Sequence, residues 1–147
     1  MKLHLTPLRE GDPDLAVLQN IHCEPSVAAF LSVADNYFSY VTETPGVLYE
    51  KIMLRGVPIG GIHSETDGDK VYFSICITAA ERRKGYAFIA MRLFLASLPE
   101  SVRTVECFVE PRNVASRHLL QKCGFAEAQP EDGLIPCRCC RATARKK

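Results

Sequence analysis

The feature that most constrains the fold is a strand, a basic turn and an apolar helix that follow one another within residues 71–98. Residues 71–77 are rich in β-branched and aromatic side chains, which is typical of a strand. Residues 88–98 are apolar apart from two polar side chains, which predicts a helix packed on several sides. The turn between them holds three consecutive cations and a glycine: Arg82, Arg83, Lys84 and Gly85. Because a helix begins with unpaired N–H groups and a partial positive charge, this junction predicts a binding site for a phosphate-bearing ligand.

The rest of the chain alternates between strand and helix signals. Strands are predicted, in chain order, at residues 3–8, 47–54, 57–63, 71–77, 102–109 and 134–142. Helices are predicted after Asp12, which can act as a cap, after Pro25, at residues 88–98 and after Asn113, with a further helical turn or two at residues 36–41. The three strands between residues 47 and 77 are joined by short turns, which predicts an antiparallel meander. Residues 102–109 follow a crossover helix, so they are expected to pair parallel to residues 71–77.

Glycines predict two local details of the backbone. Gly60 and Gly61 lie inside a predicted strand, which indicates a bulge or a close approach of another group. Gly124 is expected to end the helix that Asn113 begins, in a conformation with positive φ, and Phe125 to close that end with an apolar contact. The basic tail, residues 143–147, is expected to be solvated.

Length and composition bound the class of protein. The chain has 147 residues, so residues 1–147 are expected to form one domain. Its net charge of +1 gives no general attraction to nucleic acid or to a membrane surface. No apolar run reaches the ~20 residues that a membrane-spanning helix needs, and the N-terminus lacks the apolar segment of a signal peptide. These features predict a cytoplasmic protein with neither nucleic acid nor a membrane as partner.

The seven cysteines have two possible interpretations. Their odd number and scattered spacing indicate free thiols in a reducing compartment rather than a disulfide framework. The cluster Cys137, Cys139 and Cys140 could also suggest a metal site. However, the cluster has no second pair at zinc-finger spacing, and alternate residues of a strand point to opposite faces. Strand thiols without a metal are therefore the favoured interpretation.

Two segments carry a family resemblance. Residues 82–87 read RRKGYA and match the R/Q-x-x-G-x-G/A signature of the GNAT family of acyl-CoA-dependent N-acyltransferases. Residues 113–125 begin with Asn-Val-Ala-Ser and end with Gly-Phe, which is similar to the later N-x-x-A/S helix of that family. Residues 8–12 and 25–31 resemble the opening of the subgroup that acetylates ribosomal-protein N-termini and various small amines. The resemblance covers most of the chain, from residue 3 to residue 125.

The resemblance implies a mixed α/β (α+β) GNAT fold: a mostly antiparallel central sheet of six to seven strands with one parallel, splayed pair, flanked by about four helices. It implies an N-acetyltransferase that moves an acetyl group from acetyl-CoA to a primary amine, on a peptide or protein N-terminus or a small molecule, by direct attack on the thioester. Acetyl-CoA would be a co-substrate, and no metal is expected. The alternative is a catalytically inactive CoA-binding sensor or interaction module. Monomers and homodimers are both compatible with the family.

The resemblance also implies roles for particular residues. Backbone N–H groups at residues 83–87 would hold the CoA pyrophosphate, which small side chains at Gly85 and Ala87 allow to approach. Residues 74–79 would bond the pantetheine arm like an added strand, and the Ile77 N–H would polarise the thioester carbonyl. The expected cofactor contacts are Ile77, Thr78, Ala79, Arg82, Arg83, Lys84, Gly85, Tyr86, Ala87, Asn113 and Ser116. One of the three cations is expected to contact phosphate, and Asn113 could cap its helix, contact the cofactor or do both.

The chain departs from the family pattern where acid–base chemistry is concerned. Leu120 stands where many members have a Tyr that reprotonates the leaving thiolate, so the general acid is unassigned. Ala79 replaces the usual Pro, which costs only some rigidity of the turn. Glu106 is the preferred candidate for the base that deprotonates the acceptor amine; the other candidates are Glu110, His63 and Tyr72. Direct attack needs no enzyme nucleophile, so no covalent role is assigned to a cysteine.

Overall fold

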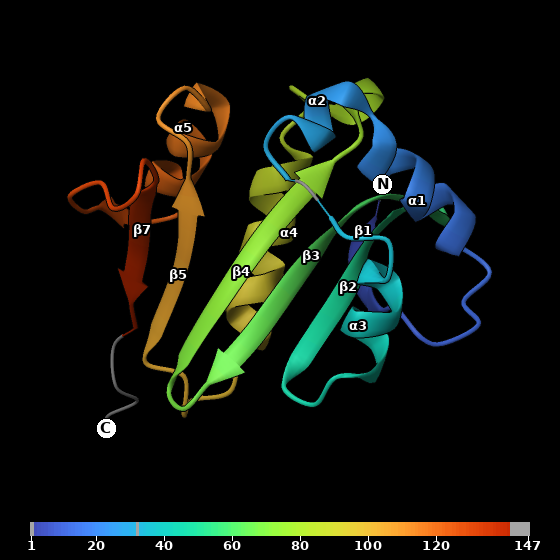
Figure 1. Cartoon of the computed structure of the whole chain (residues 1–147), viewed down its shortest axis with the longest axis horizontal. Helices are drawn as coiled ribbons and strands as arrows, with labels where there is room; N and C mark the ends of the chain where they lie inside the picture. Colours follow the sequence, from blue (N-terminus) through green and yellow to red (C-terminus); the bar gives the residue numbers. More distant parts are fainter. Residues whose placement is uncertain (1, 32, 142–147) are drawn as a thin grey trace.

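The structure, a computed structural model, describes residues 2–31 and 33–141. Within them, seven strands form one sheet in the order β1-β2-β3-β4-β5-β7-β6 (Figure 1). The strands are β1 (Leu3–Pro7), β2 (Val47–Leu54), β3 (Val57–Asp67), β4 (Lys70–Ile77), β5 (Thr104–Val109), β6 (Ala126–Glu127) and β7 (Ile135–Cys140). The helices are α1 (Leu15–Cys23), α2 (Pro25–Ala28), α3 (Tyr37–Glu43), α4 (Tyr86–Ser97) and α5 (Val114–Lys122), with a 3-10 turn, η1, at Ala79–Glu81. This architecture confirms the predicted fold class.

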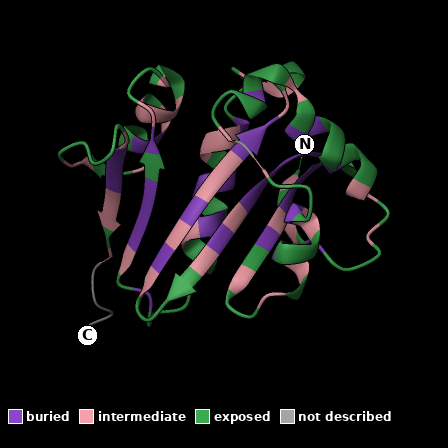
Figure 2. Ribbon diagram, in the orientation of Figure 1, coloured by how far each residue is buried: buried purple, intermediate pink, exposed green. Residues whose placement is uncertain are grey.

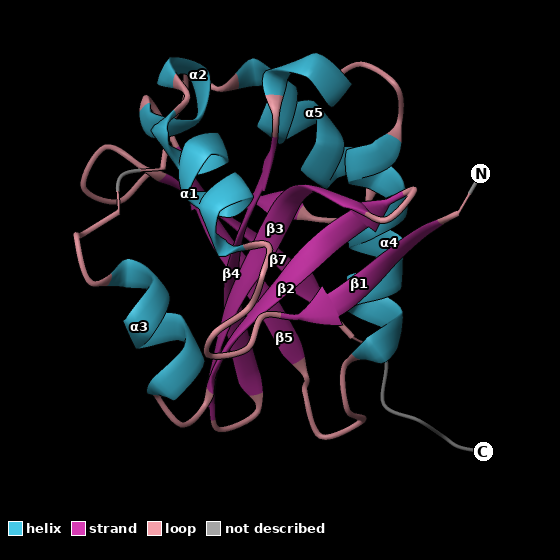
Figure 3. Cartoon of the chain, turned by 90° about the vertical axis from the view of Figure 1, so that its right-hand side faces the viewer, coloured by secondary structure: helices cyan, strands magenta, loops and turns pink. Residues whose placement is uncertain are grey.

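Helices cover both faces of the sheet (Figure 3). On one face, α4 and α5 pack on the central strands around a core that includes Val71, Met91 and Leu120. On the other face, α1 and α3 enclose a second core around Leu18 and Val41. Buried positions are concentrated along the central strands and on the sheet-facing sides of the helices (Figure 2). None of the described helices is long and apolar enough to span a membrane.

Strands β2, β3 and β4 form the predicted antiparallel meander, and its glycines explain a close approach. The register between β2 and β3 shifts at Ile52 and Met53, as expected for a bulge. A Cβ atom on Gly60 would lie 2.0 Å from the carbonyl oxygen of Cys76 in β4. One on Gly61 would lie 2.1 Å from the hydroxyl of Tyr49, whose ring covers that position. Both glycines are therefore required by packing.

Helix α4 corrects one prediction. It begins at Tyr86 rather than at residue 88, and only one side of it is buried. Met91 and Phe94 are buried against the sheet, whereas Ile89 and Leu93 are 43% and 38% exposed. The sheet lies behind one side of the helix only, so its nearly continuous apolar sequence does not imply burial all round.

The loop between β1 and α1 corrects a second prediction. Helix α1 begins at Leu15, and the Asp12 carboxylate accepts from the Asp14 N–H in the preceding turn (2.9 Å) instead of capping the helix. The carboxylates of Asp12 and Asp14 both bind the buried Lys51 ammonium of β2, at 3.0 Å and 2.8 Å respectively. Burial alone would lower the pKa of Lys51, but these two partners outweigh it and raise the pKa. The ion pairs therefore tie the loop to the sheet.

The C-terminal part follows the prediction closely up to the end of the described residues. Asn113 caps α5, Gly124 has a φ of 94°, and Phe125 is buried. Strand β7 ends at Cys140, two residues before the predicted limit, and the short β6 was not predicted. Residues 142–147, which include the predicted basic tail, lie outside the described residues.

Candidate active site

Strands β4 and β5 are parallel neighbours that separate after three residue pairs. Lys70, Val71 and Tyr72 pair with Thr104, Val105 and Glu106. Beyond these pairs, β4 continues to Ile77 and β5 to Val109 without pairing to each other. Their outer neighbours, β3 and β7, stay paired with them over that length. The sheet therefore opens at its centre, which confirms the predicted parallel, splayed pair.

The free edge of β4 exposes a fixed set of backbone groups. The Thr78 N–H donates to the Ile59 carbonyl on the β3 side (2.7 Å). Backbone groups of successive strand residues point to alternate sides, so those of residues 73, 75 and 77 point away from β3. In a parallel ladder the Tyr72–Glu106 pair is made through the Phe73 N–H, so the N–H groups that face the opening are those of Ile75 and Ile77. The Ile77 N–H, which is predicted to polarise a thioester, therefore faces the opening.

The opening leads to the basic turn. Arg83 and Gly85 both have positive φ, 63° and 84°, and α4 begins immediately afterwards at Tyr86. Among the described residues, none accepts a hydrogen bond from the backbone N–H groups of residues 83–87. Such a concave row of free N–H groups at the start of a helix suits an anion. Gly85, Tyr86 and Ala87, which are expected to contact the cofactor, all lie in this row.

The three cations of the turn differ in their contacts. Arg82 folds back, and its Nε donates to the Ile77 carbonyl (2.9 Å). Lys84 pairs with Glu81 at 3.0 Å on the surface. Arg83 makes no hydrogen bond or ion pair with the described residues. Of the three, Arg83 is therefore the side chain without any partner among the described residues.

Glu24, at the junction of α1 and α2, is a site residue that the sequence did not reveal. Its carboxylate accepts from the Thr78 hydroxyl and from the Ala79 N–H, the latter at 2.9 Å. Thr78 and Ala79 follow β4 directly, so this contact fixes the backbone between the free edge and the basic turn. Fifty-four or more residues separate the partners in sequence, so no local pattern could have indicated the contact.

Helix α5 forms the other wall of the opening. The Asn113 side chain accepts from the Ser116 N–H (3.3 Å), so the predicted cap is confirmed. Asn113 and Ser116 are both half-buried. Leu120, in the position where many family members have a Tyr, is 3% exposed and belongs to the core beneath the helix.

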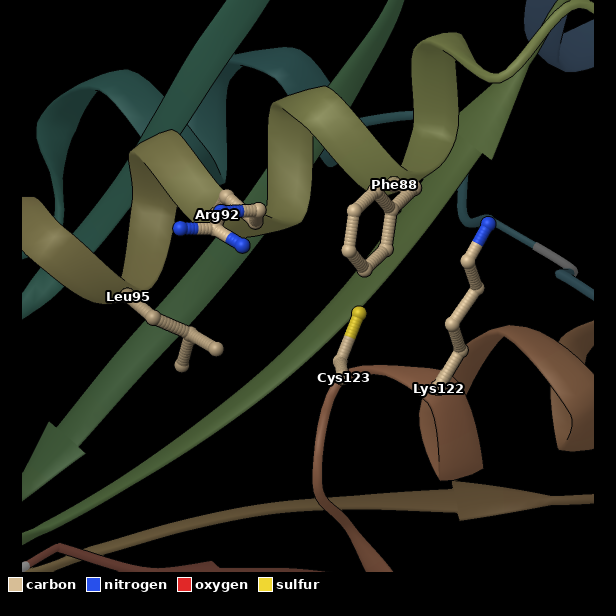
Figure 4. Close-up of a pocket in the computed structure, with 5 residues that line it drawn as sticks. All are labelled: Phe88, Arg92, Leu95, Lys122 and Cys123. Atoms are coloured by element: carbon tan, nitrogen blue, oxygen red, sulfur yellow. The ribbon is translucent and has the colours of Figure 1, made fainter.

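A groove of about 260 Å³ separates α4 from the end of α5 (Figure 4). It is lined by Phe88, Arg92, Leu95, Lys122 and Cys123. The Lys122 ammonium lies 4.5 Å from the centre of the Phe88 ring, and the Arg92 guanidinium 5.8 Å from it. Phe88 belongs to the first turn of α4, so the groove continues the cationic surface that begins at the basic turn.

Glu106 lies where β4 and β5 separate. Its carboxylate is buried, with Lys70 3.2 Å from one oxygen and Arg138 3.2 Å from the other. Next to it, the rings of Tyr72 and Phe108 stack with centroids 6.3 Å apart across the two strands. These side chains lie on the face of the sheet that α1 covers, since Val71 and Val105 belong to the core on the opposite face.

The thiols near the site are protonated at neutral pH. Burial raises the pKa of Cys76 to about 11, although a backbone contact with Gly61 partly opposes this. Burial also raises the pKa of Cys107, which lies opposite Cys137 in the sheet. A protonated thiol is a weak nucleophile, which agrees with direct attack on a thioester. Among residues 2–31 and 33–141, no three His, Cys, Asp or Glu side chains gather in a group that could hold a metal.

A family model for the acetyltransferase (GNAT) domain matches residues 2–126. The chain belongs to the GNAT acetyltransferase family. Membership makes this GNAT protein an acyl-CoA-dependent N-acyltransferase by class. No curated protein matches its sequence significantly.

Solved structures share the GNAT fold at low sequence identity. The aminoglycoside acetyltransferase AAC(6')-Ib in complex with coenzyme A is 19% identical, with a TM-score of 0.79 and 95% of each chain covered. The GNAT domain of S. lividans PAT is 12% identical, with a TM-score of 0.82, over 95% of this chain and 90% of that one. An aminoglycoside N(6')acetyltransferase from Legionella pneumophila is 13% identical, with a TM-score of 0.74, over 95% and 94%.

Proposed function

We propose that the protein transfers an acetyl group from acetyl-CoA to a primary amine. The observation that carries this proposal is the continuity between the free edge of β4 and the row of free N–H groups at residues 83–87. A pantetheine arm is a chain with two amide groups, which can pair with Phe73, Ile75 and Ile77 as a strand would. A pyrophosphate at the end of that arm then reaches the start of α4.

The chemistry follows from these positions. The Ile77 N–H can donate to the thioester carbonyl oxygen and stabilise the negative charge that develops there during attack. Arg82 holds the Ile77 carbonyl and Glu24 holds the next two residues, so the donor is fixed before the ligand arrives. We propose that Arg83 contacts a phosphate of CoA, and that Asn113 and Ser116, half-buried on the opposite wall, contact the pantetheine.

The acceptor is proposed from chemistry and from the resemblance of residues 8–12 and 25–31 to the N-terminal-amine subgroup. An α-amine titrates near ~7.7–8.0 and a Lys side chain near ~10.4, so an α-amine needs less help to become neutral. We therefore propose a peptide N-terminus or a small amine as acceptor. Glu106 remains a candidate base, and its two cationic partners, Lys70 and Arg138, compete with an acceptor amine for its lone pairs.

Two measurements test the proposal. Acetyl-CoA should raise the melting temperature of the protein, and CoA should be released in the presence of one class of amine in a panel of peptides, amino acids, polyamines and aminoglycosides. Absence of any stabilisation at saturating acetyl-CoA would refute the cofactor assignment.

For Glu106, the substitution Glu106→Gln should lower kcat if the carboxylate is the base.

A second candidate function is a CoA-binding sensor or interaction module. It is favoured by Leu120, which places a buried apolar side chain where a catalytic hydroxyl is common. Turnover with any acceptor would exclude it. We further propose a single domain over residues 1–147 that works in the cytoplasm as a monomer or homodimer, without nucleic acid or membrane partners.

A further inference from the structure

A chain of hydrogen-bonded side chains lies on the α1 face of the sheet. His63 Nε2 lies 2.8 Å from Glu65 Oε2, and His63 Nδ1 lies 2.8 Å from the Tyr37 hydroxyl. The Tyr40 hydroxyl donates to the same Glu65 oxygen at 3.0 Å. The His63 side chain is 16% exposed and that of Glu65 43%. The chain therefore leads from a nearly buried hydroxyl to a carboxylate in contact with solvent.

The partners of His63 fix its tautomer. An ionised carboxylate can only accept, so the hydrogen of the neutral imidazole must sit on Nε2, facing Glu65. Nδ1 then carries the lone pair and accepts from the Tyr37 O–H. This is the order hydroxyl, imidazole, carboxylate, which in enzymes makes a hydroxyl oxygen a better proton acceptor. Burial raises the pKa of Tyr37, so its hydroxyl relays protons rather than storing a negative charge.

The hydrogen-bonded side chains Tyr37, His63 and Glu65 lie beside the opening between β4 and β5. His63 is directly opposite Ser74 of β4, so the two side chains share a face with Cβ atoms about 5 Å apart. Ser74 belongs to the part of β4 that has no β5 partner. The phosphate-binding turn leads into α4, which covers the opposite face. An acceptor amine therefore has the α1 face as its approach, where this chain lies.

Other titratable groups that pack around His63 are unsuitable as bases. Besides its hydrogen-bond partners Tyr37 and Glu65, they are His22 from α1, Tyr40 from α3, Tyr49 from β2 and Cys76 from β4. Burial lowers the pKa of His22 to about 4, and its Nε2 is already bonded to Tyr49 (2.8 Å). The Cys76 thiol is protonated at neutral pH. His63, in contrast, combines a carboxylate partner with partial access to solvent.

We propose that the Tyr37–His63–Glu65 chain deprotonates the acceptor ammonium. A proton moves from R–NH3⁺ to the Tyr37 oxygen while the Tyr37 proton moves to His63 Nδ1, and the Glu65 carboxylate stabilises the imidazolium. The neutral amine then attacks the thioester carbon, the C–S bond breaks, and CoA leaves with the electron pair. The second proton lost by nitrogen neutralises the thiolate, and the proton on His63 passes to solvent. The inference rests on the proposed acetyl transfer.

The test compares His63→Gln, Tyr37→Phe and Tyr40→Phe, with CoA release measured against pH and CoA binding followed by thermal shift. Tyr40→Phe is the matched control, because it removes a hydrogen bond to the same Glu65 oxygen but lies outside the relay. We expect His63→Gln and Tyr37→Phe to lower kcat by about 10²-fold and His63→Gln to remove the acid limb of the pH profile. Tyr40→Phe should keep kcat within twofold, and all three should bind CoA like the wild type.

The possible failures are distinguishable. If His63→Gln keeps both its kcat and the acid limb while the wild type turns over, the relay is wrong and the acetyl transfer stands. If the wild type binds CoA but acetylates no amine in the panel, both proposals fall. If Tyr40→Phe loses as much kcat as His63→Gln, the chain is structural and the relay is again wrong.

Discussion

At the scale of single residues, His22 shows how burial couples protonation to folding. It is 4% exposed, and its Nδ1 has no hydrogen-bond partner among the described residues. Burial, helped by the nearby His63, lowers the pKa of His22 from 6.5 to about 4. The unfolded chain therefore binds this proton at a higher pH than the folded chain. The resulting stability is complete above pH ~6.5 and is lost as the pH falls towards 4.

The substitution His22→Gln should flatten this dependence, because Gln is neutral throughout and can still accept from Tyr49. We expect the wild type to lose on the order of 3 kcal/mol of unfolding free energy through this group between pH 6.5 and 4, and the variant to lose much less. Urea unfolding at several pH values measures the difference. If the unfolding free energy falls equally steeply with decreasing pH in the wild type and the variant, His22 does not titrate in this way.

Gly60 offers a second residue-scale prediction. Its Cβ would lie 2.0 Å from the Cys76 carbonyl oxygen and 2.9 Å from the Ile77 Cα, so Gly60→Ala must displace β4. We expect a loss of more than about 2 kcal/mol of unfolding free energy and weaker CoA binding, since Ile77 moves as well. Gly68→Ala is the control, because it meets open space and costs only the strain of its positive φ, about 1 kcal/mol. Equal losses in the two variants would contradict the packing argument.

At the scale of elements, the contacts of the basic turn rank its three cations. Arg83→Ala should weaken CoA binding about 5- to 10-fold, with a smaller effect at high salt, because a free guanidinium beside a phosphate is lost. Lys84→Ala should cost less than twofold, since Lys84 pairs with Glu81. Calorimetric titration with CoA at two ionic strengths measures both. A larger effect for Lys84 than for Arg83 would reverse the ranking.

Element positions were largely predictable, whereas long-range contacts were not. The Asn113 cap and the Gly124 end of α5 depend on neighbouring residues, and both predictions are confirmed. Arg82 was expected only as a charge, yet it bonds the Ile77 carbonyl because the turn folds back over the strand end. The sequence does not predict the role of Glu24, and the prediction that Asp12 caps a helix is wrong because Asp12 binds Lys51, which is 39 residues away. Local patterns carry no information about such partners.

At the scale of the whole molecule, the separation of β4 from β5 predicts an exchange pattern. The amides of Ile75 and Ile77 should exchange quickly in the free protein and slowly with CoA bound, if the pantetheine pairs with this edge. The amide of Cys76 points to β3 and should be protected in both states. Hydrogen exchange followed by NMR resolves these amides. Unchanged rates at Ile75 and Ile77 with saturating CoA would contradict the proposed path.

The overall topology could be inferred from the order of strands and helices, because a crossover helix requires the parallel pair. The face of the sheet from which each ligand approaches could not be inferred from the sequence. This face depends on whether the side chains of Glu106 and His63 point towards α1 or towards α4. Alternation along a strand gives the two sets of side chains that share a face, but it does not tell which set faces which helix. The partners of Glu106, Lys70 and Arg138, come from two different strands. Assignment of a base therefore had to wait for the structure.

The gap in the sheet also bears on the solubility of the chain without its ligand. Proteins usually shield strand edges, because exposed N–H and C=O groups recruit strands from other molecules. Here the unshielded edge lies at the centre of the sheet and belongs to an apolar strand. A ligand that pairs with Phe73, Ile75 and Ile77 would also cover this edge. The cellular supply of CoA would then set how much of the protein escapes aggregation, as well as how fast it works.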